Sequence, residues 1–110
     1  MNTADETQSS RKLTAQQLLD AGLSDWRQLS QALHARFATG DYAKGAALVA
    51  AVAEAADKAN HHPDVTLTYP HVDITTRSHD VGGITVRDID LAREISRIAA
   101  EQGVVAEPRD

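Results

Sequence analysis

The chain contains no cysteine, so disulfide bonds, thiol nucleophiles and cysteine-ligated metal sites are excluded. It also lacks a long hydrophobic run. The longest one, residues 46–53, is far shorter than the roughly 20 residues that a membrane-spanning helix needs. Residues 1–11 are polar, with no apolar segment of the kind that a secretory signal peptide contains. We therefore expect a cytoplasmic protein without membrane contact.

Aromatic residues and basic clusters are also scarce. The aromatic residues, 4% of the chain, are Trp26, Phe37, Tyr42 and Tyr69. The core must therefore consist mainly of Ala, Val, Leu and Ile, and because alanine-rich helices bury little area each, we expect self-association. The 11 Lys and Arg residues form no run and face 16 Asp and Glu, which gives a formal charge of −5. Nucleic-acid binders usually show a basic face, so no nucleic-acid partner is expected.

At 110 residues the chain is long enough for one domain with a modest core. Composition sets the expected boundaries. Residues 1–10 are polar and aperiodic and predict a disordered tail, and residues 104–110 are charged and predict a frayed C-terminus. Residues 11–103 are expected to form the folded domain.

The first two helices are predicted from their N-terminal signals. Thr14 and Gln17 form a capping box, which predicts a short helix over residues 15–21. Asp41 follows a glycine and is suited to cap a helix over residues 42–59, which are rich in alanine, leucine and valine.

The second half of the chain predicts a hairpin followed by a helix. Residues 65–69 and 72–76 alternate between apolar and polar side chains, with a turn at Pro70-His71. A second capping box, Thr85-Val86-Arg87-Asp88, then begins a helix that ends at Gly103. Its apolar stripe consists of Leu91, Ala92, Ile95, Ile98 and Ala99.

Residues 26–39 are ambiguous. Leu29, Leu33 and Phe37 have the spacing of one helix face. Leu33, Ala35 and Phe37 equally alternate with polar residues, as in a strand. Periodicity alone does not decide between the two.

Three of the five histidines, His61, His62 and His79, each stand beside a residue that ends regular structure. Two carboxylates are available to them: Asp57 lies one helical turn before His61, and Asp88 lies in the following capping box. Histidine has an ordinary pKa of about 6.5, so it both gives and takes protons near neutrality. This cluster predicts a small acid/base site whose rings converge on one cavity.

Each of these residues also has a purely structural explanation. His61 and His62 are expected at a helix C-terminus, where imidazolium groups interact favourably with the helix dipole. His79 fits an exposed loop and Asp88 a helix cap, while Asp57 either orients the ring of His61 or belongs to the solvated surface.

Other chemistries fit the sequence less well. Three histidines and a carboxylate could bind zinc, but no His-x-x-x-His pair exists and adjacent histidines rarely bind one metal, so we expect no metal. Ser78 adjoins His79 without a nucleophile elbow around it. Gly82-Gly83 lacks the lysine and spacing of a phosphate-binding loop. General acid/base catalysis on a small molecule remains.

The arrangement of these residues resembles that of the pterin-4a-carbinolamine dehydratase family, also called 4a-hydroxytetrahydrobiopterin dehydratases. The matching segments are His61-His62-Pro63, Tyr69, Ser78-His79-Asp80, Gly82-Gly83-Ile84-Thr85 and Asp88-Ile89-Asp90-Leu91-Ala92. With Trp26, Phe37 and Asp41-Tyr42 upstream, the resemblance covers about residues 13–102.

The resemblance implies an α+β fold, a four-stranded antiparallel sheet with helices packed on one face. It implies that residues 26–38 form two short antiparallel strands, although Ser30-Gln31 between them lacks the expected glycine or asparagine. It also implies a homodimer or homotetramer. The expected activity is that of a hydro-lyase, which dehydrates 4a-hydroxytetrahydropterin to quinonoid dihydropterin and water with no cofactor.

The resemblance further implies a pocket for the pterin substrate. Its expected catalytic residues are His61, His62 and His79, of which His62 and His79 are the preferred proton-transfer pair. The expected substrate-binding residues around them are Asn60, Pro63, Ser78, Asp80, Asp88 and Asp57.

Three positions depart from the family pattern. Val65 replaces a common aromatic residue, Leu67 a common asparagine, and Asn60 an acidic residue. They flank the expected pocket and could change how a pterin is held. The alternative function is therefore a non-catalytic one, either pterin binding or a role as a dimerisation or assembly partner.

Overall fold

The computed structural model describes residues 10–107. The tail expected over residues 1–10 lies outside the described residues except for Ser10. In chain order the elements are α2 (Ala15–Asp20), β1 (Arg27–Leu29), β2 (Ala32–Ala38), α3 (Tyr42–Ala59), β3 (Asp64–Leu67), β4 (His71–Thr76), α4 (Val86–Glu101) and β5 (Val105–Ala106). No helix within residues 10–107 has the length and apolarity needed to cross a membrane.

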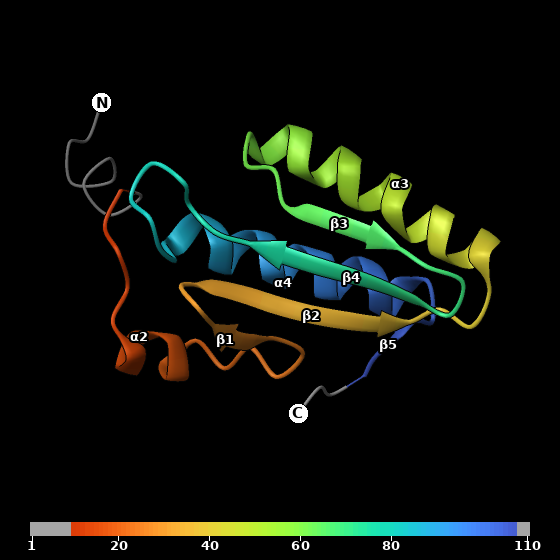
Figure 1. Cartoon of the computed structure of the whole chain (residues 1–110), viewed down its shortest axis with the longest axis horizontal. Coiled ribbons are helices and arrows are strands. Elements are labelled where there is room, and N and C mark those ends of the chain that lie inside the picture. Colours follow the sequence, from red (N-terminus) through yellow and green to blue (C-terminus); the bar gives the residue numbers. More distant parts are fainter. Residues whose placement is uncertain (1–9, 108–110) are drawn as a thin grey trace.

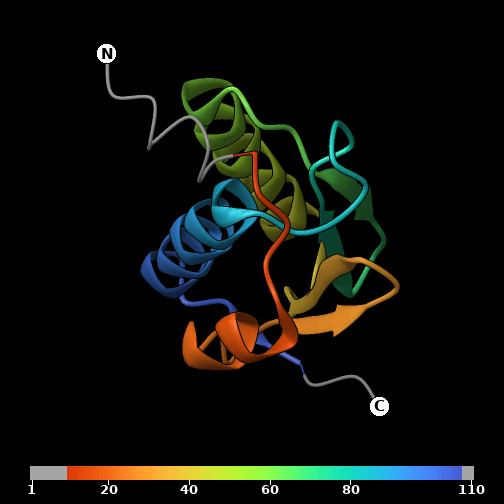
Figure 2. The ribbon, with the colours of Figure 1, turned by 90° about the vertical axis from the view of Figure 1, so that its left-hand side faces the viewer.

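The five strands form one antiparallel sheet, in which four follow in the order β1-β2-β4-β3 and β5 pairs with β2 (Figure 1). Helices α3 and α4 lie side by side over one face of this sheet, and α2 lies next to β1 (Figures 1 and 2). The expected α+β class, an antiparallel sheet with helices on one face, is confirmed, and β5 is a fifth strand beyond the four expected.

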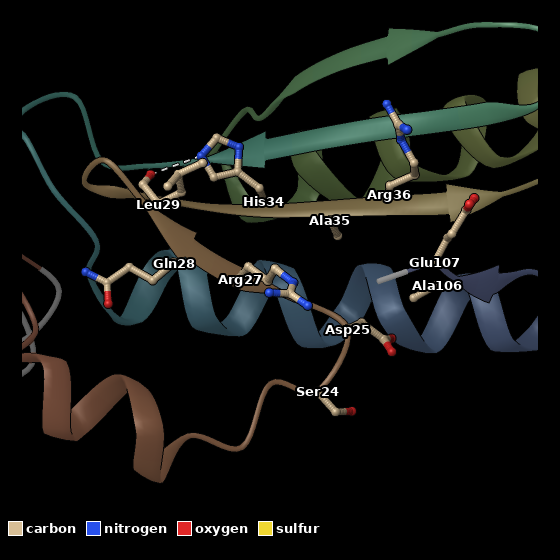
Figure 3. Close-up of a pocket in the computed structure, with 10 residues that line it drawn as sticks. All are labelled: Ser24, Asp25, Arg27, Gln28, Leu29, His34, Ala35, Arg36, Ala106 and Glu107. Atoms are coloured by element: carbon tan, nitrogen blue, oxygen red, sulfur yellow. Dashed lines mark hydrogen bonds between the residues drawn. The ribbon is translucent and has the colours of Figure 1, made fainter. Parts of the chain in front are cut away.

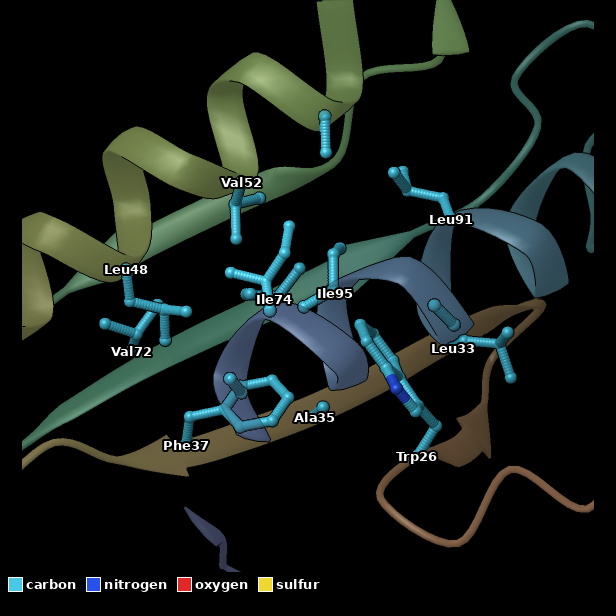
Figure 4. Close-up of a cluster of buried hydrophobic side chains, with 14 of the residues drawn as sticks. Trp26, Leu33, Ala35, Phe37, Leu48, Val52, Val72, Ile74, Leu91 and Ile95 are labelled. Carbon is cyan, nitrogen blue, oxygen red and sulfur yellow. The ribbon is translucent and has the colours of Figure 1, made fainter. Parts of the chain in front are cut away.

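The core lies between the sheet and the two long helices (Figure 4). Alternate residues of the two central strands point into it, because successive side chains of a strand face opposite sides of the sheet. Trp26 packs edge-on against Phe37, with ring centroids 6.2 Å apart, and donates a hydrogen bond from its indole nitrogen to Ser96 Oγ. The buried strand and helix residues labelled there with them are Leu33, Ala35, Val72, Ile74, Leu48, Val52, Leu91 and Ile95.

Strand pairing resolves the ambiguous segment in favour of β1 and β2. The chain reverses at Ser30 and Gln31, whose φ angles are +52° and +66°. A two-residue hairpin turn of type I′ has positive φ at both central residues, and here two residues that carry a Cβ atom adopt it. The predicted hairpin of β3 and β4 is also present, but Tyr69-Pro70 occupy its turn and His71 already begins β4.

The frayed C-terminus expected from residue 104 is wrong for residues 104–107. Val104 is buried in the core and so anchors the chain after α4. Val105 and Ala106 then pair with the edge of β2 that the short β1 leaves free. The backbone N–H of Glu107 donates to the carbonyl of Arg36 at 2.7 Å, and its carboxylate lies 2.7 Å from His71 Nε2. These contacts depend on the sheet and have no local sequence signal.

Candidate active site

The C-terminal end of α3 determines where His61 and His62 point. Asn60 adopts a left-handed conformation with φ +51°, which stops the helix. The N–H groups of Asn60 and His61 donate to the carbonyls of Asp57 and Ala56, the pairing of a Schellman motif. After this turn the His61 side chain is buried and that of His62 is exposed. Asn60, expected to bind substrate, thus has a backbone role in directing the two rings.

His61 is paired with a fully buried carboxylate. Its Nε2 lies 2.6 Å from Asp88 Oδ1, and none of Asp88 is exposed. The Thr76 hydroxyl also donates to Oδ1, at 2.6 Å, while Oδ2 accepts from the Ser78 hydroxyl at 2.8 Å and from the Thr85 N–H at 2.9 Å. The carboxylate therefore accepts four hydrogen bonds. A buried charge is tolerated when it is satisfied in this way.

The second ring nitrogen of His61 faces outward. Nδ1 of His61 has no hydrogen-bond partner among residues 10–107. It is nevertheless not a buried atom, because the one buried side-chain nitrogen or oxygen without a partner among these residues is Thr39 Oγ1. Nδ1 therefore belongs to the roughly tenth of the His61 side chain that is exposed. Because an ionised carboxylate only accepts hydrogen bonds, Nε2 carries the proton in the neutral ring and Nδ1 keeps the free lone pair. The accessible atom is therefore the one able to exchange a proton.

His62 has its own carboxylate. Its Nε2 lies 3.0 Å from Asp57 Oδ1, and both side chains are largely exposed. The sequence left Asp57 either to orient the ring of His61 or to belong to the solvated surface. In the structure Asp57 lies on the surface and pairs with His62, while His61 pairs with Asp88.

His79 follows β4 in an exposed loop beside Asp80. Asp80 forms an ion pair with Arg87, whose Nη2 donates to Oδ1 at 2.9 Å and to Oδ2 at 3.1 Å. The hydrogen bond from Arg87 holds the pKa of this carboxyl below its ordinary value. Asp80, expected to bind substrate, is thus held by a side chain at the start of α4.

The remaining expected residues have mostly supporting positions. Ser78 and Asp88 are fully buried with their polar atoms bonded to protein groups, so they support His61 instead of facing a ligand. Pro63 is half-buried after the end of α3. Thr76, which sequence reasoning missed, belongs to the same buried network. Its only signal is a hydroxyl at a position where β4's alternation places a core residue.

The expected common cavity does not coincide with either of two cavities found on the described surface. One of about 420 Å³ lies where β2 is flanked by β1 and β5 (Figure 3). The other, of about 520 Å³, lies beside α2 and Trp26. Neither is lined by His61, His62 or His79. Within residues 10–107 no three His, Asp or Glu side chains are grouped to hold a metal ion.

Comparison with known proteins places the chain in a family. The model of the family described as "Pterin 4 alpha carbinolamine dehydratase" matches residues 7–98. A relative from Thermosynechococcus vestitus is 39% identical over 79 residues, 72% of this chain and 83% of its own. One from Nocardia farcinica is 40% identical over 77 residues, 70% of this chain and 81% of its own. Both are named "Putative pterin-4-alpha-carbinolamine dehydratase".

Two solved structures have a similar fold. A protein from Brucella melitensis described as a transcriptional coactivator/pterin dehydratase superposes with a TM-score of 0.77 at 30% identity, over 81% of this chain and 99% of its own. A pterin dehydratase-like protein described as a RuBisCO assembly factor of the alpha-carboxysome gives 0.55 at 24% identity, over 67% of this chain and 86% of its own, a likeness of fold alone. The chain belongs to the pterin-4a-carbinolamine dehydratase family.

Proposed function

We propose that the chain catalyses the dehydration of 4a-hydroxytetrahydropterin, of which 4a-hydroxytetrahydrobiopterin is the expected form, to quinonoid dihydropterin and water. The observation that carries this proposal is the pairing of two consecutive imidazoles with separate carboxylates, His61 with Asp88 and His62 with Asp57. Family membership supplies the substrate class.

The reaction needs one acid and one base. The hydroxyl group leaves C4a with a proton from an acid, while N5–H gives its proton to a base, so that water and the quinonoid product form. An imidazole performs either role near neutral pH without a metal or an organic cofactor. His61 is suited to exchange a proton at Nδ1, and the exposed rings of His62 and His79 are the candidates for the second group.

The direct test is to add the purified protein to a reaction that generates the carbinolamine and to follow the quinonoid absorbance. Acceleration that is proportional to protein concentration is expected. A rate equal to that of the uncatalysed dehydration would overturn the proposal.

A second candidate function is non-catalytic pterin binding or assembly with another protein. It is favoured by the exposure of His62 and His79 and by the absence of all three histidines from both cavities described above. A pterin-binding protein without turnover would show no acceleration in this assay, but a thermal melt with added pterin would show protection from unfolding. An assembly partner would show neither effect.

A further inference from the structure

Thr76 has an unusual environment for the last residue of a core strand. It follows Val72 and Ile74 on the face of β4 that packs against the helices, and only 1% of it is exposed. A third apolar residue would continue this pattern. The hydroxyl at this position donates to Asp88 Oδ1 at 2.6 Å.

The same carboxylate oxygen also accepts the hydrogen bond from His61. Both donors lie 2.6 Å from Asp88 Oδ1, one from β4 and one from the end of α3. The other oxygen, Oδ2, is held by groups near the start of α4. The Thr76 hydroxyl thus fixes the one carboxylate oxygen that contacts His61.

We infer that Thr76 is a positioning residue for His61. With its hydroxyl in place, Asp88 Oδ1 presents a fixed acceptor to Nε2, so the neutral ring keeps its proton on Nε2 and its lone pair on the accessible Nδ1. Groups that orient a histidine through its second nitrogen set the tautomer and ring direction in this way. The catalytic consequence rests on the proposed function, whereas the tautomer does not.

Valine at position 76 is the informative substitution, because it keeps the branched shape of threonine and removes the donor. Asp88 Oδ1 then has His61 as its remaining partner and a vacant acceptor site, so the carboxylate is free to shift. A merely space-filling role for Thr76 would leave His61 unchanged in this variant.

The experiment is ¹⁵N NMR of histidine-labelled protein above the titration range of the imidazoles, with the His61 signals assigned by a His61→Gln variant. The unsubstituted protein should show His61 protonated at Nε2. Thr76→Val should show a mixture of tautomers, and Thr76→Ser, which keeps the hydroxyl, should restore the original signal. Turnover in Thr76→Val should fall on the order of 10-fold or more, with Thr76→Ser close to the original.

Thr39→Val is the matched control. Thr39 is also a buried threonine, but its Oγ1 has no partner among the residues that the structure describes, so removing it should leave the His61 signal unchanged. If Thr76→Val does not fold, Thr76→Ala replaces it against Thr76→Ser. A fixed Nε2–H tautomer without the Thr76 hydroxyl, or a mixture in Thr76→Ser, overturns the inference. A tautomer change in a protein with no dehydratase activity supports the inference and refutes the proposed function.

Discussion

Asp88 shows how one residue serves two purposes. The capping box and the acid/base site were alternative explanations of this residue in the sequence. In the structure Oδ2 accepts the Thr85 N–H and caps α4, while Oδ1 accepts from His61. The start of one helix is thereby tied to the end of another, because the capping carboxylate of α4 also binds His61.

The exposed histidines are tested by His62→Ala and His79→Ala. Each should lower the dehydration rate on the order of 10²-fold or more if it supplies an acid or base, because that is the contribution of one such group. The measurement is the carbinolamine assay together with a thermal melt, which should change little because both side chains are exposed.

His71→Gln is the control for these variants. His71 lies at the opposite end of β4 from the His79 loop and pairs with Glu107, so its replacement should leave turnover unchanged. Near-full rates in both His62→Ala and His79→Ala would show that neither ring is needed for proton transfer.

The left-handed conformation of Asn60 leads to a prediction about stability. The left-handed conformation costs a residue with a Cβ atom about 1–2 kcal/mol, and asparagine tolerates it better than most residues. Asn60→Ala should therefore lower the free energy of unfolding by about 1 kcal/mol, whereas Asn60→Gly should change it little. Urea denaturation measures both. Equal stability of the two variants would mean that the turn does not constrain the end of α3.

Among the secondary-structure elements, β3 contains two of the residues that depart from the family pattern. Val65 and Leu67 pair with Ile74 and Val72, whose side chains face the helices. Both are half-buried against the core. A Cβ atom on Gly45 of α3 would lie only 2.6 Å from Leu67 Cδ1, so the helix approaches the strand closely there. Packing against α3 therefore explains the leucine at position 67, and Val65 contributes to the core beside it.

The turn between β1 and β2 provides a test of an element. Because Ser30 and Gln31 both have positive φ, relief of the strain at one of them should stabilise the hairpin. Gln31→Gly should unfold with a free energy about 1 kcal/mol higher than Gln31→Ala, which keeps the Cβ atom. Chemical denaturation of the two variants decides this, and a less stable glycine variant would contradict it.

At the scale of the whole molecule, several large apolar side chains remain on the surface. They are Leu19, Leu29, Tyr42, Tyr69 and Val105. The core contains two aromatic rings, Trp26 and Phe37, and otherwise aliphatic side chains. Burial of the exposed groups in a homodimer or homotetramer would add the apolar area that a small core lacks.

Sedimentation velocity of the purified chain should therefore give a mass of a dimer or a tetramer rather than the 11.8 kDa of one chain. Dilution should shift the distribution toward the monomer and lower the thermal midpoint, because assembly stabilises the folded chain by mass action. A species that stays monomeric at all concentrations would show that the core is sufficient alone.

The sequence by itself determined the helix caps, the apolar stripe of α4 and the hairpin of β3 and β4. These depend on residues within a few positions of one another, and local backbone chemistry decides them. It did not decide between helix and strand for residues 26–39, where the family resemblance was needed, because Leu33 and Phe37 fit both periods.

Only the tertiary structure decided which carboxylate meets which histidine. Asp57 is near both rings in the chain, yet the turn at Asn60 directs His61 toward Asp88, 27 positions away. Thr76, Ser78 and β5 likewise acquire their roles from strands and helices that are distant in sequence. Pairings of this kind arise from packing of the sheet against the helices, which no local pattern encodes.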